Sequence, residues 1–328
     1  MKILIVVYHP FELWQAPPWF SQRLQQDFPG VEVVQRKEYG DIEGDLLDAD
    51  IAVTWSLRPE QFRAARKLRW IHSPAAAVHA LMIPEVVAGD VVVTNARDVH
   101  GPVVAEHAIA LVLALAKRLP SAFRYQRKST WAQDKIWRES PQPREVAGAT
   151  LGLVGLGSIG LETAKRAAGL GMKVMAVREH ADRPHEPCVS KVFATSQLDE
   201  LLQVSDYVVL AAPLTSRTRA LINRDRLLRM KDDAYLINVS RGALVDHVAL
   251  LDALAQRRIA GAALDVFEKE PLPADSPLWK ADNLVITPHT AALTDKLWER
   301  HYALVSENLR RFLVGTTLLN TVDKARGY

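Results

Sequence analysis

The chain has 328 residues, 48% of them hydrophobic and 24% charged, which is the composition of a globular protein long enough for two domains. A formal net charge of +3 indicates neither a nucleic-acid-binding nor a membrane-surface protein. The single cysteine, Cys188, excludes an internal disulfide and a thiol-based zinc site, and we expect no bound metal. The first apolar run is too short for a signal peptide, and Glu106 interrupts the longest one, so we expect a cytoplasmic protein without a membrane segment.

Short apolar runs alternate with helix-compatible polar segments through the first hundred residues. The predicted strands are Ile3–Val7, Val31–Val34, Ile51–Thr54 and Val91–Thr94, and helices are predicted at Pro18–Asp27 and Glu60–Lys67. This alternation predicts a parallel sheet that helices cover on both faces.

The middle of the chain combines an apolar helix with a basic, aromatic segment. The predicted helix Gly101–Leu119 is apolar nearly all round, which is typical of a helix buried between layers or subunits. Residues 121–144 are polar and basic and include Trp131 and Trp137. Such a mixture also occurs in nucleic-acid-binding proteins. Because the rest of the chain is not basic, we expect a dimerisation arm or a packed loop, and no nucleic-acid partner.

A second series of alternating elements begins at residue 150. The predicted strands are Thr150–Val154, Lys173–Val177, Tyr207–Leu210, Ala234–Val239, Ala262–Val266 and Leu284–Thr287, with helices at Ile159–Ala168, His247–Gln256 and Asp295–Phe312. One helix leaves the first series before this one, and another returns after it. We therefore expect an α/β protein with two doubly wound parallel sheets, in which a second domain (99–290) is inserted into a first, discontinuous domain (1–98 and 291–328).

A glycine-rich turn, GLGSIG, follows the strand that begins the second series and opens a helix. In dinucleotide-binding proteins the first glycine, here Gly155, permits a tight turn, and the second, Gly157, lets the backbone approach a pyrophosphate. The third, Gly160, lets the helix pack closely on the strand, and the amino end of the helix attracts phosphates. A purely structural turn between strand and helix is the alternative.

Arg178 follows the next strand, at the position where NAD-binding domains usually place an acid for the ribose hydroxyls. A guanidinium suits a ribose 2′-phosphate, which a carboxylate would repel. We therefore expect NADP as the cofactor, with NAD as the other candidate. In the alternative, Arg178 faces solvent and Glu179 binds the ribose.

Three polar residues follow the ends of three later strands: Arg241, Glu270 and His289. Ligands of open parallel sheets bind beyond the carboxyl ends of the strands, so we expect these residues to converge. An arginine can bind the carboxylate of a 2-keto acid and polarise the adjacent carbonyl. A histidine can protonate the carbonyl oxygen, and a carboxylate beside it favours the protonated ring. Each residue alone could have a structural role, and their common setting favours the chemical one.

The motifs GLGSIG, NVSRGALVD, GAALDVFEKEPLP and ITPHTAA resemble those of the D-isomer-specific 2-hydroxyacid dehydrogenase family, and the resemblance covers almost the whole chain. It implies a Rossmann domain inserted into a discontinuous flavodoxin-like substrate domain, a dimer, and a catalytic trio of Arg241, Glu270 and His289. It also implies cofactor contacts at Ser158, Ile159, Pro213, Thr218, Val239, Ser240, Arg241, His289 and Asp265, the last of these at the nicotinamide amide.

The substrate contacts that the resemblance implies are Arg241 and the loop Ala76, Ala77 and Val78, whose backbone amides would hold the substrate carboxylate. This loop usually reads Ala-Gly-Val-Asp in the family. An alanine restricts the backbone where the family has glycine, so we expect a changed loop.

Within the family, the chain is most similar to the NADPH-dependent glyoxylate/hydroxypyruvate reductases. The shared features are YHP near the start, Trp55, SPLW at residues 276–279 and the terminal ARGY. Trp55 would then line the substrate pocket, and a tryptophan of the core is the alternative. We expect an oxidoreductase that transfers a hydride between NAD(P)H and a small 2-keto or D-2-hydroxy acid. The alternatives are a dehydrogenase of another small anion, such as phosphite, and a dinucleotide-sensing protein similar to a corepressor.

Overall fold

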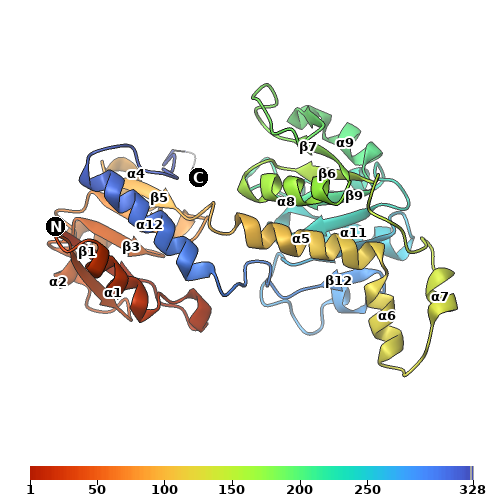
Figure 1. The fold of residues 1–328 in the computed structure, drawn as a ribbon, viewed down its shortest axis with the longest axis horizontal. Coiled ribbons are helices and arrows are strands. Elements are labelled where there is room, and N and C mark those ends of the chain that lie inside the picture. Colours follow the sequence, from red (N-terminus) through yellow and green to blue (C-terminus); the bar gives the residue numbers. More distant parts are fainter. Residues whose placement is uncertain (326, 328) are drawn as a thin grey trace. The chain divides into compact units, whose positions relative to one another are not determined.

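The computed structural model of the protein describes residues 1–325 and 327 (Figure 1). Two residues of the ARGY motif, Arg326 and Tyr328, lie outside the described residues. The chain divides into two compact units: the first comprises Met1–His100 and the chain from Leu293 onward, and the second comprises Gly101–Ala292.

The first unit contains a five-stranded sheet whose strands are all parallel, in the order β2-β1-β3-β4-β5. The strands are β1 (Lys2–Val6), β2 (Glu32–Arg36), β3 (Ile51–Thr54), β4 (Trp70–Ser73) and β5 (Val92–Asn95). The helices are α1 (Pro18–Asp27), α2 (Glu43–Leu46), α3 (Pro59–Ala64), α4 (Pro84–Ala88) and α12 (Leu297–Leu313). This strand order is that of flavodoxin-like folds.

Alternating side chains of the strands give this sheet two separate cores. Ile3 and Ile5 of β1 pack with apolar residues of α1 and α12, including Phe20. The alternate residues of the same strand, Leu4 and Val6, pack with apolar residues of α2 and α4 on the other face. Because both faces are covered, β1 and β3 are apolar almost throughout, which is why the sequence pattern predicted them.

The second unit contains a seven-stranded parallel sheet in the order β12-β11-β10-β9-β6-β7-β8. The strands are β6 (Thr150–Val154), β7 (Lys173–Val177), β8 (Lys191–Phe193), β9 (Tyr207–Leu210), β10 (Tyr235–Asn238), β11 (Gly261–Leu264) and β12 (Leu284–Ile286). The helices are α5 (Gly101–Ala116), α6 (Leu119–Gln126), α7 (Gln133–Trp137), α8 (Ser158–Gly169), α9 (Leu198–Val204), α10 (Arg224–Leu227) and α11 (His247–Ala255). Six of the strands have the order of the doubly wound dinucleotide-binding fold, and β12 extends it. The predicted fold class is confirmed.

Helices also cover both faces of the second sheet. Tyr207 and Val209 of β9 pack with apolar residues of α5 and α8, and their neighbours Val208 and Leu210 pack with apolar residues of α9 and α11. Figure 1 shows α5 and α8 side by side on one face, while α6 and α7 stand out from the sheet. In the described part of the chain, no helix is long and apolar enough to cross a membrane.

Some elements differ from the prediction. The strand β4 was not predicted, because the buried polar residues His72 and Ser73 make up half of it and interrupt the apolar pattern. The strand β8 was missed because it has three residues. The helix predicted to reach Leu119 ends at Ala116, and Arg118 adopts a left-handed conformation with φ 56° before α6 begins. The basic segment 121–144 contains most of α6 and all of α7.

Candidate active site

The predicted cofactor residues of the second unit lie at one edge of its sheet, because they follow the carboxyl ends of parallel strands. The turn after β6, together with the start of α8, contains Gly155, Gly157, Ser158, Ile159 and Gly160, and the segment after β7 begins with Arg178. The loop after β9 contains Pro213 and Thr218, and the loop after β10 contains Val239, Ser240 and Arg241. The last two strands, β11 and β12, are followed by Asp265 and His289. Ligands of open parallel sheets bind at this edge.

The glycine turn between β6 and α8 has the geometry that a pyrophosphate site requires. Gly155 has a φ of 102°, and a Cβ there would lie 2.7 Å from the carbonyl oxygen of Ala211. A Cβ on Gly160 would lie 2.2 Å from the carbonyl oxygen of Gly155. Around Gly157, by contrast, a Cβ would meet nothing within 4 Å, and no side chain caps the amino end of α8. The first N–H groups of this helix thus suit an anionic group.

At the end of β7 an arginine and a glutamate stand next to each other. The Arg178 guanidinium donates to the backbone carbonyl oxygens of Arg183 and Pro184. The Glu179 carboxylate forms an ion pair with Arg217, which belongs to the loop after β9, at 2.5 Å. Two cations therefore neighbour the position where the ribose of a dinucleotide is bound in this fold, and the acid there already interacts with one of them.

The loop after β9 is held by Thr218. Its hydroxyl donates to the carbonyl oxygen of Pro213 at 2.7 Å and accepts from the N–H of Thr215 at 2.7 Å. The hydroxyl of Ser240 donates to the carbonyl oxygen of Ala212 and ties the end of β10 to this loop. The hydroxyl groups of Thr218 and Ser240 therefore stabilise the loop after β9 at the carboxyl edge of the sheet.

The turn that presents Arg241 depends on Asn238, a fully buried residue at the end of β10. Its amide nitrogen donates to the carbonyl oxygen of Arg241 at 2.9 Å, and its amide oxygen accepts from the N–H of Ser240 at 3.1 Å. Val239 is buried, whereas Arg241 is exposed and donates to the carbonyl oxygen of Ser240 at 2.7 Å. Sequence reasoning missed Asn238, although an amide at the end of an apolar strand is a usable signal.

Gly242 lets the loop of Arg241 approach the loop of Glu270. A Cβ on Gly242 would lie 2.0 Å from the carbonyl carbon of Phe267 and 2.4 Å from the backbone nitrogen of Glu268. Atoms do not approach so closely in proteins, so any larger residue would push these two loops apart.

The Glu270 carboxylate joins its own loop to His289. One oxygen accepts from the backbone N–H of Phe267 at 2.8 Å, and the other lies 2.6 Å from Nδ1 of His289. Because an ionised carboxylate only accepts, Nδ1 carries the proton in this contact and Nε2 is left for a substrate. The two side chains are 34% and 50% exposed, respectively, so small molecules can reach them.

The buried carboxylate of Asp265 holds the backbone around His289. It accepts from the hydroxyl of Thr287 at 2.6 Å and from the N–H groups of Thr290 at 2.8 Å and Ala291 at 3.0 Å. The carbonyl oxygen of Asp265 accepts from the N–H of His289 at 2.9 Å. His289 has a φ of 53°, a left-handed conformation that is uncommon for histidine. Asp265 thus stabilises this conformation from both sides.

The predicted substrate residues of the first unit follow two adjacent strands, β3 and β4. Trp55 is half-buried against the core, and its Nε1 is buried without a hydrogen-bond partner in the described part of the chain. The carbonyl oxygen of Ala76 accepts from the side chain of Asn95 at 2.8 Å, and Val78 is buried. Ala77 has no left-handed φ, so alanine adopts this loop conformation without backbone strain.

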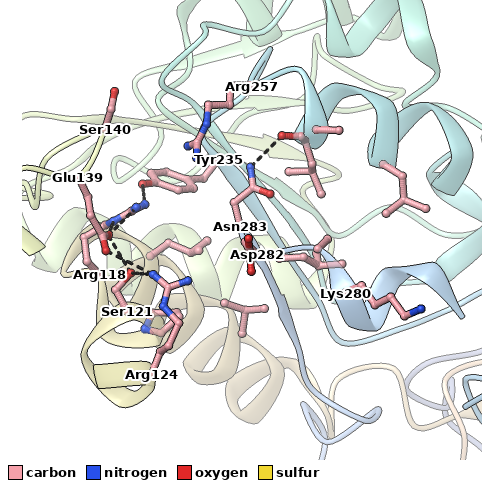
Figure 2. Close-up of a pocket in the computed structure, with 18 of the residues that line it drawn as sticks. Arg118, Ser121, Arg124, Glu139, Ser140, Tyr235, Arg257, Lys280, Asp282 and Asn283 are labelled. Carbon is pink, nitrogen blue, oxygen red and sulfur yellow. Dashed lines mark hydrogen bonds and ion pairs between the residues drawn. The ribbon is translucent and has the colours of Figure 1, made fainter. Parts of the chain in front are cut away.

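A large hollow in the second unit lies at the other end of β10 from Arg241 (Figure 2). It has a volume of about 810 Å³, and its lining includes Tyr235, which begins β10, whereas Arg241 follows the end of that strand. Arg118 contacts the Glu139 carboxylate at 2.7 Å and donates to the Tyr235 hydroxyl at 3.3 Å. The hollow therefore lies at the amino ends of the strands, where the sheet has no predicted catalytic residue.

Comparisons with known proteins agree with this fold. Residues 109–291 match the family model of the D-isomer specific 2-hydroxyacid dehydrogenase, NAD binding domain. A glyoxylate reductase from Korarchaeum cryptofilum is 37% identical over 283 residues, which cover 85% of this chain and 84% of that protein. A D-isomer specific 2-hydroxyacid dehydrogenase from Xanthobacter autotrophicus, solved with NADPH and MES, has a TM-score of 0.83 and 33% identity over 99% of both chains.

A third similar protein is an NADPH-dependent glyoxylate/hydroxypyruvate reductase from Sinorhizobium meliloti, solved with NADP and sulfate. Its TM-score is 0.81 and its identity 27%, and the match covers 100% of both chains. The fold and the strand-end site define a nicotinamide-dinucleotide oxidoreductase. The chain belongs to the D-isomer-specific 2-hydroxyacid dehydrogenase family, and it is an NAD(P)-dependent 2-hydroxyacid dehydrogenase. The predicted family and the nicotinamide cofactor are confirmed, and these relatives support neither the phosphite nor the corepressor alternative.

The close approach at Gly242 leads to a first prediction. We expect Gly242→Ala to lower the free energy of unfolding by about 1–3 kcal/mol, because its methyl group overpacks the contact with Phe267. We expect kcat/KM to fall at least about tenfold, because the loops of Arg241 and Glu270 separate. Urea unfolding and steady-state kinetics measure the two effects.

Gly169→Ala is the matched control for this change. A Cβ there meets nothing within 4 Å, and Gly169 ends α8 in the same unit. An alanine in a helix is neutral or stabilising by about 0.5–1 kcal/mol, so this variant should keep full activity. Full activity of Gly242→Ala would contradict the role of the loop contact.

Proposed function

We propose that the protein reduces small 2-keto acids to 2-hydroxy acids, of D configuration where the product is chiral, and prefers NADPH. Glyoxylate and hydroxypyruvate are the first candidate substrates. The observation that carries this proposal is the contact of 2.6 Å between Glu270 and Nδ1 of His289. It stands at the edge of the sheet where Arg241 is also presented. The names of the relatives, glyoxylate reductase and glyoxylate/hydroxypyruvate reductase, support the substrate class.

The proposed roles follow from the chemistry of the three side chains. Arg241 binds the substrate carboxylate through its planar guanidinium and polarises the neighbouring carbonyl. His289 donates the proton from Nε2 to the carbonyl oxygen as that oxygen gains negative charge. Glu270 holds the ring through Nδ1 and so orients Nε2 for the proton transfer. In the oxidation of a hydroxy acid, His289 accepts the proton instead.

The cofactor fits the turn between β6 and α8, where the left-handed Gly155, the open space at Gly157 and the uncapped helix end suit a pyrophosphate. When bound, NADPH supplies the hydride for the carbonyl carbon and is itself oxidised to NADP. Arg178 is proposed to bind the 2′-phosphate, and Arg217 neutralises the neighbouring Glu179 carboxylate, which would otherwise repel that phosphate. Asp265 is proposed as the neighbour of the nicotinamide amide.

We further propose a role for each unit. Residues 1–98 and 291–328 would form the substrate domain, and residues 99–290 the dinucleotide-binding domain. In the first of these, Trp55 supplies an apolar surface with one buried N–H, and the loop Ala76–Val78 supplies backbone N–H groups for the substrate carboxylate. These groups follow adjacent parallel strands, an arrangement that supports a common binding role.

The proposed reaction is tested by following the oxidation of NADPH with a panel of 2-keto acids. Wild-type protein should turn over at least one short keto acid, and His289→Ala and Arg241→Ala should each lower kcat/KM by about 100-fold or more. Glu270→Gln should have a smaller effect, because the amide can still accept a hydrogen bond from Nδ1. If no acid is reduced, or if His289→Ala is fully active, the proposed function is wrong.

The cofactor preference is tested with Arg178→Gln. Loss of the guanidinium should raise the KM for NADPH about tenfold or more and leave the KM for NADH nearly unchanged, since only NADPH carries the 2′-phosphate. Lys165→Gln is a matched control, because it removes an exposed cation from α8 of the same unit. Equal changes for both cofactors, or none, would exclude Arg178 from this role.

We also propose a cytoplasmic homodimer without a nucleic-acid partner. Trp131 and Trp137 are 90% and 58% exposed, and such large exposed aromatic groups are typical of protein interfaces. Sedimentation equilibrium should give a dimer for the wild type and a weaker dimer for Trp131→Ala with Trp137→Ala. Val248→Ala, at a residue 71% exposed on α11, should leave the dimer intact. A wild-type monomer at micromolar concentration would contradict the proposal.

A further inference from the structure

His107 on α5 reaches the carboxyl end of β12 from a distant part of the sequence. Its Nε2 lies 3.0 Å from the hydroxyl oxygen of Thr287 and 3.5 Å from a carboxylate oxygen of Asp265. The His107 side chain is 21% exposed and that of Asp265 is 1% exposed. The roles proposed above for this edge of the sheet do not include His107.

The directions of these hydrogen bonds follow from the groups involved. The Asp265 carboxylate only accepts, so the Thr287 hydroxyl uses its one proton to donate to it at 2.6 Å. The oxygen of Thr287 then accepts from His107, which requires the proton of the imidazole ring to be on Nε2. His107, Thr287 and Asp265 thus form a chain of donors that ends at the buried carboxylate.

The surroundings of His107 favour a neutral ring that still donates from Nε2. Burial lowers the pKa of His107, and the nearby Asp265 carboxylate acts in the opposite direction. A neutral donor leaves the negative charge of Asp265 available for the N–H groups of Thr290 and Ala291. Those N–H groups belong to the two residues that directly follow His289.

We propose that His107 is a positioning residue for the reaction, which acts through Thr287 and Asp265 to hold the backbone of His289 in its left-handed conformation. The proposal rests on the proposed function of His289 as the proton donor. A left-handed histidine persists only where its surroundings determine it. Asp265 makes the direct contacts, and its own orientation depends on Thr287, whose hydroxyl is directed by His107.

The first test compares His107→Leu with His107→Gln. Leucine fills the space without a donor, whereas the amide nitrogen of glutamine stands close to the position of Nε2. We expect His107→Leu to lower kcat about tenfold and to change the KM values for NADPH and keto acid less than about twofold, because the lost alignment matters in the transition state. His107→Gln should recover most of the wild-type kcat.

Thr287→Val breaks the same chain with a side chain of the same shape, and it tests the proposal even if His107→Leu does not fold. It should lower kcat to a similar extent, and the double variant His107→Leu with Thr287→Val should be no worse than either single variant. Ser205→Ala is the matched control. It removes a buried hydroxyl that lies just before the amino end of β9 and donates to the carbonyl oxygen of Leu201 in α9. This variant should keep full activity.

The outcomes distinguish this inference from the proposed function. A wild-type protein that reduces no keto acid contradicts the proposed function. If the wild type is active and His289→Ala is not, three results would overturn the role of His107 alone. These are a normal kcat in a folded His107→Leu or Thr287→Val, an equal loss in His107→Gln and His107→Leu, and additive losses in the double variant.

Discussion

The hydrogen bond between the Glu270 carboxylate and Nδ1 of His289 determines what this site can do. It assigns the proton of the contact to Nδ1, so that Nε2 is the ring nitrogen available to a substrate. The carboxylate is itself directed by the backbone N–H of Phe267, and the same loop lies against Gly242, beside Arg241. Three strands thus bring an acid, an imidazole and a guanidinium to one edge of the sheet.

A second carboxylate, that of Asp265, has a different task, because it is buried and interacts with backbone groups around His289. Left-handed backbone conformations of residues other than glycine cost about 1–3 kcal/mol and cluster at functional sites. Here the cost is offset by hydrogen bonds to a charged acceptor, which are stronger than those between neutral groups. The exposed Glu270 can therefore act on the proton while Asp265 fixes the geometry.

Much of this arrangement was predictable from the sequence because the strands are buried and parallel. Apolar runs located most of the strands, and the rule that ligands bind beyond their carboxyl ends brought Arg241, Glu270 and His289 together. The donor chain from His107 was not predictable, since His107 and Thr287 are 180 positions apart in the sequence. The strand β4 was missed because its buried residues include polar ones.

The end of α5 could not be predicted from the apolar pattern of the sequence either. The apolar pattern continues to Leu119, and only the backbone of Arg118 ends the helix and starts α6. Local backbone conformations of this kind depend on tertiary contacts, such as the ion pair between Arg118 and Glu139. The same holds for His289, whose left-handed φ depends on the contacts of the distant Asp265 with its backbone and with that of its neighbours.

The central claim is that the Glu270 carboxylate holds the imidazole of His289 through Nδ1. It is tested most directly by kcat/KM for keto-acid reduction in the wild type, Glu270→Leu, Glu270→Gln and the control Glu268→Gln, a change at an exposed acid that pairs with Arg219. Leucine cannot accept the hydrogen bond from Nδ1, so Glu270→Leu should lower kcat/KM about 100-fold or more, whereas Glu270→Gln, whose amide oxygen still accepts, should lose less. The control should match the wild type. A fully active Glu270→Leu would contradict the account.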